Sequence, residues 1–393
     1  MKILVICQYY YPEPFRLPDI CSELVKQGHE VTVVTGVPNY PMGKIYPGYG
    51  HRQKRNEVID GVKVHRCFTI GRRSGPLFRM LNYYSYPLSS SRYVAKMKEE
   101  YDVVFVNQLS PIMMADAAIK YKKKHGTRLV MYCLDMWPES LTAGGIGTDS
   151  AIYRHYRKVS AKIYRQADEL LISSKSFRKY IVDEFGIADE KIKYMPQYSE
   201  ELFTPETCSK AQDENIDLLF AGNIGTVQSV ETIVRAAAAT RDIENLRWHI
   251  VGDGSDLENC KKLAEELGVE SITFYGRKPI EEMPKYYSMA DAMLITMEVN
   301  DSISRTLPGK VQTYMAAGKP IIGAINGEAA DVISEANCGL CTNAENSDGL
   351  AELVREFCSE RKITEYGENS RSYYVNVFAK DAAMRILEES LSR

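Results

Sequence analysis

The sequence lacks any apolar run long enough to span a lipid bilayer. A membrane-spanning helix needs about 20 consecutive apolar residues, and the 393-residue chain has no run that approaches this length. The first residues, MKILVICQYYYPEP, carry one Lys and a short apolar run that ends before a Pro. This pattern is typical of a buried strand and not of a signal peptide. We therefore expect a cytoplasmic protein, with at most peripheral contact with the inner face of the membrane.

Cysteine provides no framework of disulfides or metal ligands. The 9 Cys are odd in number and scattered, which favours a reducing compartment. Cys338 and Cys341 form a C-x-x-C without a second pair, so we do not assign them a metal or redox role. The chain also has no Asp-x-Asp motif. We expect no metal and no cofactor.

The charge is nearly balanced at −3 but is divided unevenly. Residues 1–200 contain 30 Lys and Arg against 20 Asp and Glu, whereas residues 201–393 contain 19 against 32. A basic first half suggests contact with an anionic surface or acceptor, although chance surface composition would give the same count. Nucleic-acid binding is not favoured, because the basic residues form no single tract.

Short apolar strands alternate with amphipathic helices along the whole chain, which predicts two doubly wound α/β domains. The first half has candidate strands at 1–7, 29–35, 61–70, 102–106, 128–134, 169–173 and 191–194. The second half has them at 217–221, 246–251, 272–275, 292–296, 321–322 and 339–341. The expected helices include 19–28, with Asp19 as N-cap, 230–239, with Ser229 as N-cap, and 380–391. The expected division is 1–196, a linker at 197–206, a second domain at 207–378 and a final helix within 379–393.

The stretch from Thr306 to Gly323 predicts a loop, a helix and a strand. The helix N-terminus carries partial positive charge and suits an anion. Lys310 lies in the first turn, where a cation opposes the helix dipole. It fits that place if it shares a phosphate with the backbone. A solvated surface Lys is the alternative.

The same stretch reads P-x-K-x-x-x-Y-M-A-A-G-K-P from Pro308 to Pro320. It resembles the donor-site segment of glycosyltransferase family four, in a fucosamine-transferase-like subgroup of polysaccharide biosynthesis. The resemblance implies the GT-B fold, a nucleotide-sugar donor, retention of anomeric configuration and a last helix that crosses back onto the first domain. The general family has two Glu in this segment, and those places hold Arg305 and Thr313.

Asp135 follows a predicted strand and begins the motif D-M-W-P-E, which recurs in the same subgroup. A carboxylate at the end of a strand could hold or deprotonate an acceptor hydroxyl. The alternative is that Asp135 caps a helix that starts at Pro138. Gly144, Gly145 and Gly147 make the following loop flexible.

Further candidates lie where strands end, because ligands bind at the carboxyl edge of open α/β sheets. With Asp135 and Lys310 as the catalytic pair, the candidate donor-binding residues are Gly222, Asn223, Ile224, Gly225, Gly252, Arg277, Arg305, Pro308, Gly309 and Thr313. The candidate acceptor-side residues are Arg16, Asn107, Gln108 and Glu139. Lys310, with Arg277 or Arg305, would replace a divalent ion at the diphosphate.

The stretch Gly71–Arg92 interleaves four Arg with large apolar side chains. This composition suits an interfacial segment on an anionic membrane. A helix packed on its own domain would account for it equally well.

These features together predict a retaining glycosyltransferase that moves a hexose or N-acetylated hexosamine, with UDP as the favoured nucleotide, to a saccharide or lipid-linked acceptor of a bacterial surface polysaccharide such as capsule or O-antigen. A sugar-nucleotide epimerase or phosphorylase of the same fold is one alternative. A non-catalytic subunit that binds donor or lipid is another, and the missing Glu residues favour it.

Overall fold

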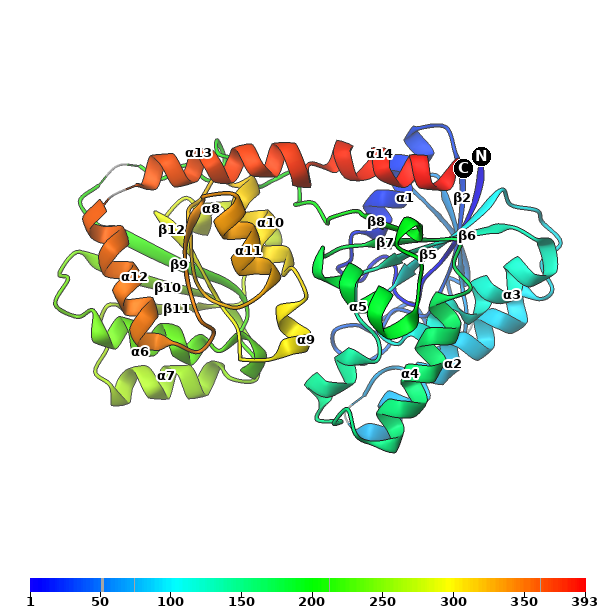
Figure 1. Cartoon of the computed structure of the whole chain (residues 1–393), viewed down its shortest axis with the longest axis horizontal. Coiled ribbons are helices and arrows are strands. Elements are labelled where there is room, and N and C mark those ends of the chain that lie inside the picture. The colour runs from blue at the N-terminus through cyan, green and yellow to red at the C-terminus, as the bar shows by residue number, and fades with distance from the viewer. Residues whose placement is uncertain (51–52, 74, 212, 361) are drawn as a thin grey trace. The chain divides into compact units, whose positions relative to one another are not determined.

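The structure, a computed structural model, describes residues 1–50, 53–73, 75–211, 213–360 and 362–393. The chain forms two compact units (Figure 1). Unit 1 contains Met1–Met195 and Met384–Arg393, and unit 2 contains Pro196–Ala383. The residues expected as a linker, 197–206, therefore belong to unit 2, whereas the last ten residues belong to unit 1.

Unit 1 is built on an eight-stranded sheet in the order β3-β4-β2-β1-β5-β6-β7-β8. Every neighbouring pair is parallel except β3 and β4. The four residues of β5 from Val103 to Val106 are buried on both sides, as a parallel sheet between helix layers requires. The strands are β1 Lys2–Ile6, β2 Glu30–Thr35, β3 Asn56–Ile59, β4 Val62–Arg66, β5 Val103–Gln108, β6 Arg128–Cys133, β7 Glu169–Ile172 and β8 Ile192–Tyr194.

Helices connect the strands of unit 1. They are α1 Leu17–Lys26, α2 Pro76–Val94, α3 Asp116–His125, α4 Ala151–Tyr164 and α5 Ser176–Phe185, with short 3-10 turns at Ile112–Ala115, Glu139–Gly144 and Asp189–Lys191. The prediction that Asp19 caps α1 is wrong. The helix begins two residues earlier, with Arg16 at the N-cap position, because Pro18 is favourable in the first turn of a helix.

Unit 2 contains a six-stranded parallel sheet in the order β11-β10-β9-β12-β13-β14. The strands are β9 Ile216–Asn223, β10 Leu246–Asp253, β11 Ile272–Gly276, β12 Ala292–Thr296, β13 Ile321–Ala324 and β14 Gly339–Thr342. The helices are α6 Val230–Ala239, α7 Leu257–Glu266, α8 Met283–Tyr287, α9 Asp301–Ser304, α10 Gly309–Ala316, α11 Glu328–Glu335, α12 Ser347–Glu360 and α13 Ile363–Tyr373. Short turns lie at Thr226–Gln228 and Ile280–Glu282, and a π-helical turn at Tyr374–Phe378 precedes α14 Lys380–Leu391.

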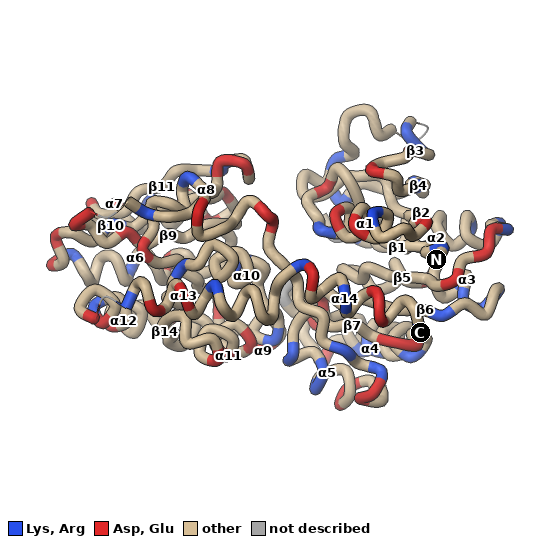
Figure 2. The backbone as a smooth tube through the Cα atoms, turned by 90° about the horizontal axis from the view of Figure 1, so that it is seen from above, with Lys and Arg blue, Asp and Glu red and all other residues tan. Residues whose placement is uncertain are grey.

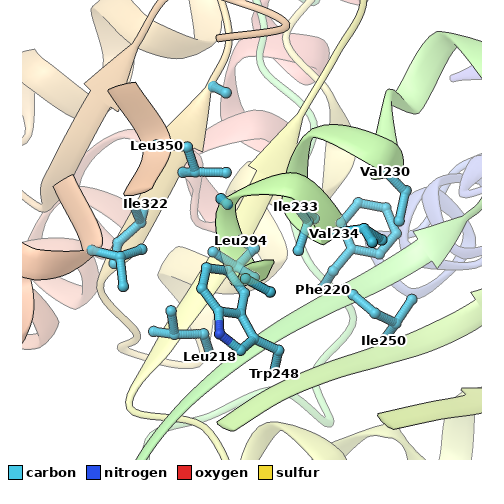
Figure 3. Packing of buried hydrophobic residues seen from close by; sticks show 14 of the residues in the cluster. Leu218, Phe220, Val230, Ile233, Val234, Trp248, Ile250, Leu294, Ile322 and Leu350 are labelled. Atoms are coloured by element: carbon cyan, nitrogen blue, oxygen red, sulfur yellow. The ribbon is translucent and has the colours of Figure 1, made fainter. Parts of the chain in front are cut away.

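The core of unit 2 lies between the sheet and helices α6 and α12. Trp248 of β10, Phe220 of β9 and Leu294 of β12 are fully buried there (Figure 3). Ile233 of α6 and Leu350 of α12 close this layer from the helix side. Phe220 matters for the site described below, because a charged side chain packs against its ring.

The end of the chain packs within unit 1. Arg128 of β6 donates a hydrogen bond from Nε to the carbonyl of Ser390 at 3.3 Å, and Lys193 donates to the Ser390 hydroxyl at 3.2 Å. These contacts attach the second half of α14 to the strands β6 and β8.

Each sheet reverses its strand order beside its first strand. In unit 1, β1 lies between β2 and β5, and in unit 2, β9 lies between β10 and β12. Ligands of open α/β sheets bind at such switch points, outside the carboxyl ends of the strands. The fold thus singles out the loops after β1, β5 and β6, and those after β9 and β12. No helix among the described residues is both long and apolar enough to cross a membrane.

Candidate active site

Helix α10 is attached directly to the switch point of unit 2. The Tyr314 hydroxyl accepts a hydrogen bond from the Ala221 amide and donates to the Ala221 carbonyl, both at 3.2 Å, and it lies 3.4 Å from the carbonyl of Leu294. Ala221 belongs to β9 and Leu294 to β12. Because residues four apart lie on the same face of a helix, Lys310 projects toward the end of β9.

The Lys310 ammonium is buried and has no hydrogen-bond partner among the described residues. Its Nζ lies 4.0 Å from the centroid of the Phe220 ring and 3.0 Å from the position that a Cβ on Gly222 would occupy. The alternative of a solvated surface Lys is therefore wrong. Burial lowers the pKa of Lys310 to about 7, because an ammonium in an apolar site loses its hydration.

Two glycine loops beside Lys310 are packed backbone against backbone. A Cβ on Gly252 would lie 1.8 Å from the Gly222 carbonyl oxygen, and one on Gly254 would lie 2.2 Å from that of Ile224. The Ile224 amide donates to the Asp253 carbonyl at 2.9 Å. Side chains at these positions would separate the loops, so glycine keeps the backbone at the end of β9 close to Lys310 and partly exposed.

Helix α6 begins at Val230, as predicted from the sequence, and does not follow the first glycine loop directly. A 3-10 turn at Thr226–Gln228 intervenes. The Gln228 carboxamide oxygen accepts from the Gly225 amide at 3.2 Å and from Asn223 Nδ2 at 2.7 Å. Ser229 takes the N-cap position, but its hydroxyl pairs with that of Thr232 at 2.9 Å and does not cap the helix. The helix start that faces the switch point is that of α10.

The other donor-side candidates are distributed around this point. Pro308 is the N-cap residue of α10 and Gly309 its first residue, and the Thr313 hydroxyl donates to the Gly309 carbonyl at 3.1 Å. Arg277 is exposed and follows the edge strand β11, with β10 between it and β9. Arg305 is half-buried at the end of α9. Among the described residues, no three His, Cys, Asp or Glu side chains come together as ligands for a metal ion.

In unit 1, Asp135 follows β6 and its carboxylate is held by the neighbouring strand's loop. The Ser110 hydroxyl donates to Asp135 Oδ2 and lies 2.9 Å from the Ser140 hydroxyl. Gln108 Nε2 donates to the Asp135 carbonyl at 3.0 Å. Burial raises the pKa of Asp135, while the hydrogen bonds from Ser110 and the Met136 amide act in the opposite direction. A carboxyl group with a raised pKa at a strand end is suited to proton transfer.

Asp135 is not a helix cap, so that alternative is wrong. The turn that follows, Glu139–Gly144, has Pro138 at its N-cap position and no capping side chain. Trp137 is buried and its ring packs edge-on against those of Tyr83 and Tyr156, with centroids 5.6 Å apart in each case.

The acceptor-side candidates differ in where they lie relative to the carboxyl edge of the unit 1 sheet and in what they contact. Asn107 and Gln108 are buried at the end of β5. Arg16 starts α1, and its charge acts on Tyr132 of β6. The Glu139 carboxylate is buried and accepts a hydrogen bond of 2.5 Å from the Tyr153 hydroxyl. This hydrogen bond gives the Glu139 carboxylate a structural role within unit 1.

The sequence did not reveal the role of Glu13. This buried carboxylate accepts hydrogen bonds from three backbone amides, those of Tyr10 at 3.1 Å, Asn39 at 2.8 Å and Tyr40 at 2.7 Å. It thereby joins the loop after β1 to the loop after β2. A Glu between two Pro in a Tyr-rich loop was the available signal, but two of its three partners lie 26 and 27 residues away in sequence.

Two family models match the chain and together cover most of it. Residues 208–373 match "Glycosyl transferases group 1" and residues 16–197 match "Glycosyl transferase 4-like domain". The chain has two Rossmann-like sheets, and the N-terminus of α10 lies at the switch point of the second. Together with the two family matches, this fold shows that the chain belongs to the GT-B glycosyltransferases of the group 1 and GT4-like families. The predicted fold class is confirmed.

Relatives with this fold come from several bacteria. The chain is 24% identical over 380 residues to the putative colanic acid biosynthesis glycosyl transferase WcaI of Escherichia coli, covering 91% of this chain and 92% of that one. It is 26% identical over 257 residues to the probable glycosyltransferase WbjE of Pseudomonas aeruginosa, covering 63% and 64%. Among solved structures, Anabaena HepE in complex with UDP aligns over 100% of both chains with a TM-score of 0.73 and 15% identity. WaaG, a glycosyltransferase involved in lipopolysaccharide biosynthesis, aligns over 98% of both with a TM-score of 0.67 and 16% identity.

Proposed function

We propose that the protein is a retaining glycosyltransferase of bacterial surface-polysaccharide biosynthesis. It moves a hexose or an N-acetylated hexosamine from a nucleoside diphosphate sugar, with UDP favoured, to a saccharide or lipid-linked acceptor. The name of WcaI, which refers to colanic acid biosynthesis, and the description of WaaG, which refers to lipopolysaccharide biosynthesis, support the polysaccharide context. The UDP complex of HepE supports the choice of nucleotide. Unit 2 binds the donor and unit 1 the acceptor.

The observation that carries this proposal is the ammonium of Lys310 beside the start of α10, which has no hydrogen-bond partner in the described part of the chain. An isolated buried charge is costly, and its cost is recovered when an anion arrives. The first amides of a helix have no partner inside the helix and bear partial positive charge. A diphosphate leaving group gains negative charge as the sugar departs, so fixed positive charge at this place stabilises the transition state.

Asp135 supplies the complementary function in unit 1. Its carboxylate holds the acceptor hydroxyl and receives its proton as the new glycosidic bond forms. The Ser110 hydroxyl and the Met136 amide orient it. Lys310, with Arg305 or Arg277, takes the place that a divalent ion has in metal-dependent transferases.

A thermal-shift screen of nucleoside diphosphate sugars tests the proposal. A ligand at 100 times its dissociation constant stabilises the folded protein by about 2.7 kcal/mol, so we expect UDP-sugars to raise the melting temperature by several degrees. Product analysis with the donor alone then separates the alternatives, because an epimerase or phosphorylase needs no hydroxylic acceptor. Binding of a donor without transfer to any supplied acceptor would instead identify a non-catalytic subunit, and no response to any donor would contradict donor binding itself.

We further propose that unit 1 works at an anionic membrane, through helices α2 and α4. Their 33 residues contain six Lys and Arg and no Asp or Glu. Figure 2 marks Lys and Arg in blue and Asp and Glu in red along the chain. One side of α2 exposes large apolar side chains, namely Leu77, Met80, Leu81, Tyr84 and Leu88. The Tyr84 hydroxyl bonds that of Tyr156 in α4 at 2.8 Å, and α4 adds the exposed Ile152.

The spacing of these residues supports that proposal. They recur every three or four positions, so they form one stripe along the helix, with Arg79 and Arg92 also exposed. The opposite side, with Tyr83, Tyr86 and Ser90, is buried against the unit. An apolar stripe with the exposed Arg92 at its side suits the headgroup region of an anionic bilayer. One side of α2 therefore packs on unit 1, while the opposite side is exposed and is the side that we propose contacts the membrane. Ser74, within the stretch predicted from sequence, lies outside the described residues.

Replacing Leu77 and Leu88 together by Asn should weaken binding to vesicles that contain anionic lipid by about 10-fold or more, since each exposed Leu loses apolar burial worth about 1 kcal/mol or more. Co-sedimentation with vesicles, with and without anionic lipid, measures this. Val58→Asn is the matched control, because Val58 is an equally exposed apolar residue of unit 1 on β3. Equal loss in both variants would contradict the assignment of α2.

A further inference from the structure

The guanidinium of Arg72 is the notable unused charge at the carboxyl edge of the unit 1 sheet. Among the described residues, it has no hydrogen-bond or ion-pair partner. Its positive charge acts on both Asp135 and Tyr9, lowering the pKa of each against the larger effect of burial. Arg72 thus influences Asp135, the proposed proton acceptor, while no ion pair joins the two side chains in the described structure, and its guanidinium is available for a ligand.

The backbone of Arg72 is held in place by buried polar groups. The Arg72 amide donates to Asn39 Oδ1 at 3.1 Å, and Asn39 Nδ2 donates to the Val37 carbonyl at 2.9 Å. Asn39 is buried, and its own amide donates to the buried Glu13 carboxylate at 2.8 Å. Glu13 therefore fixes Asn39, and Asn39 fixes Arg72. A buried network of this kind holds one conformation, so the backbone position from which the Arg72 side chain extends is fixed.

The head of Arg72 lies over an aromatic surface that leads to the Asp135 loop. Its Cζ is 5.8 Å from the centroid of the Tyr83 ring. Tyr83 packs in turn against Trp137, two residues after Asp135. An Arg stacked on an aromatic ring keeps its planar fork free for a phosphate, which it binds bidentately.

We propose, on the basis of the glycosyl transfer proposed above, that Arg72 binds a phosphate group of the acceptor, so that the acceptor is a phosphate or diphosphate ester of a saccharide and not a neutral saccharide. The ester is placed beside the carboxylate that receives the proton of the attacking hydroxyl. The donor diphosphate is assigned to Lys310 of unit 2, and the experiment below separates the two ligands.

Binding can be followed through a single fluorescent reporter. The chain has two Trp, and Trp248 is in the core of unit 2. Trp248→Phe leaves Trp137, which packs on the ring beneath Arg72, as the sole reporter. Lys310→Met in the same protein removes the buried cation of the donor site and so weakens phosphate binding there. The probes are inorganic pyrophosphate and geranyl diphosphate, with geraniol as the uncharged counterpart.

We expect a saturable change in Trp137 emission with both phosphate probes and none with geraniol. Arg72→Gln should weaken this binding by about 10- to 100-fold, the usual loss for one charge-assisted bidentate contact. Arg72→Lys, which keeps the charge but not the fork, should be intermediate. Arg73→Gln is the matched control, because Arg73 is the exposed neighbour that lies over Phe78 at 5.6 Å, and it should leave binding unchanged. Equal losses in the Arg72 and Arg73 variants, or no saturable response, would overturn the proposal.

A second arm separates this proposal from the proposed function. In the otherwise unsubstituted protein, Arg72→Gln should leave donor-induced thermal stabilisation and slow hydrolysis of the UDP-sugar unchanged. It should raise the KM for a phosphate-bearing acceptor with little change in kcat. Unchanged acceptor KM with intact donor binding would overturn the role of Arg72 alone, whereas loss of donor binding in every variant would count against the glycosyltransferase itself.

Discussion

Lys310→Met should lose about 10²–10³-fold in turnover while the folded protein becomes more stable. The loss follows from the removal of one preorganised charge at the departing diphosphate, which typically contributes about 2–4 kcal/mol to lowering the barrier. The gain follows from burial. The ammonium of Lys310 packs on Phe220 without a hydrogen-bond partner among the described residues, and Met fills a similar volume without a charge. Initial rates and denaturant unfolding of both proteins measure the two effects.

The stability difference should depend on pH in a defined direction. The pKa of Lys310 is lowered from the ordinary 10.5 to about 7 in the folded protein. Between these values the unfolded chain holds a proton that the folded chain has released, so the free energy of unfolding rises with pH across this window. The deficit of the wild type relative to Lys310→Met is therefore complete below about pH 7, at up to about 5 kcal/mol for a shift of this size, and narrows as the pH rises toward 10.5.

Lys319→Met provides the matched control. Lys319 is another buried Lys of unit 2, and burial lowers its pKa to about 8. Its Nζ, however, donates to the Ala290 carbonyl at 2.7 Å, so its removal costs a hydrogen bond and should bring no comparable stabilisation. Turnover should be retained in that variant. If Lys310→Met turns over normally, or if both variants lose turnover equally, Lys310 has no specific part in the reaction.

The strands of both sheets were predictable where burial alone decides the structure. β1, β5 and β12 are continuous apolar runs, which few structures other than buried parallel strands accommodate. The edge strand β3, NEVI, was missed because half of it faces solvent and only its antiparallel pairing with β4 defines it. The local sequence pattern predicts an element well when the apolar side chains of that element are themselves the reason for its burial.

Helix α13 was missed for a similar reason, because distant residues and not its own sequence stabilise it. Its sequence, ITEYGENSRSY, contains Gly and Ser residues of low helix propensity. Tertiary contacts stabilise it, since the Ser370 hydroxyl donates to the Lys319 carbonyl at 2.7 Å and Arg371 donates to the Ala316 carbonyl at 2.8 Å. Partners about 50 residues away in sequence cannot be deduced from composition.

The candidate site shows the same division. Lys310 and Asp135 were chosen as candidates because each occupies a position that is unusual for a purely structural residue, at a helix start and after a buried strand. Their surroundings were not predictable. Phe220 lies 90 residues before Lys310, and Ser110 lies 25 residues before Asp135. The solvated Lys and the helix-capping Asp were reasonable local alternatives that only the long-range packing excludes.

Asp135→Asn should reduce turnover by about 10²–10⁴-fold, the range that a positioned general base contributes, with donor binding intact. The amide has nearly the same shape but cannot accept the proton of the acceptor hydroxyl. Single-turnover rates together with the donor-induced thermal shift measure the two quantities. Near-normal turnover in Asp135→Asn would show that the side chain only orients the acceptor, because an amide can still make a hydrogen bond.

The pH profile distinguishes a base from a structural carboxyl group at this position. Burial already raises the pKa of Asp135, and the hydrogen bond from Ser110 opposes that rise. Ser110→Ala removes a donor that favours the ionised form, so the pH below which turnover falls should move upward while the plateau rate changes little. Glu139→Gln tests the neighbouring carboxylate, whose partner is the Tyr153 hydroxyl. This variant should alter the free energy of unfolding without shifting the pH below which turnover falls. If Ser110→Ala leaves the pH profile unchanged, the fall in turnover at low pH does not report the titration of Asp135, and another group transfers the proton.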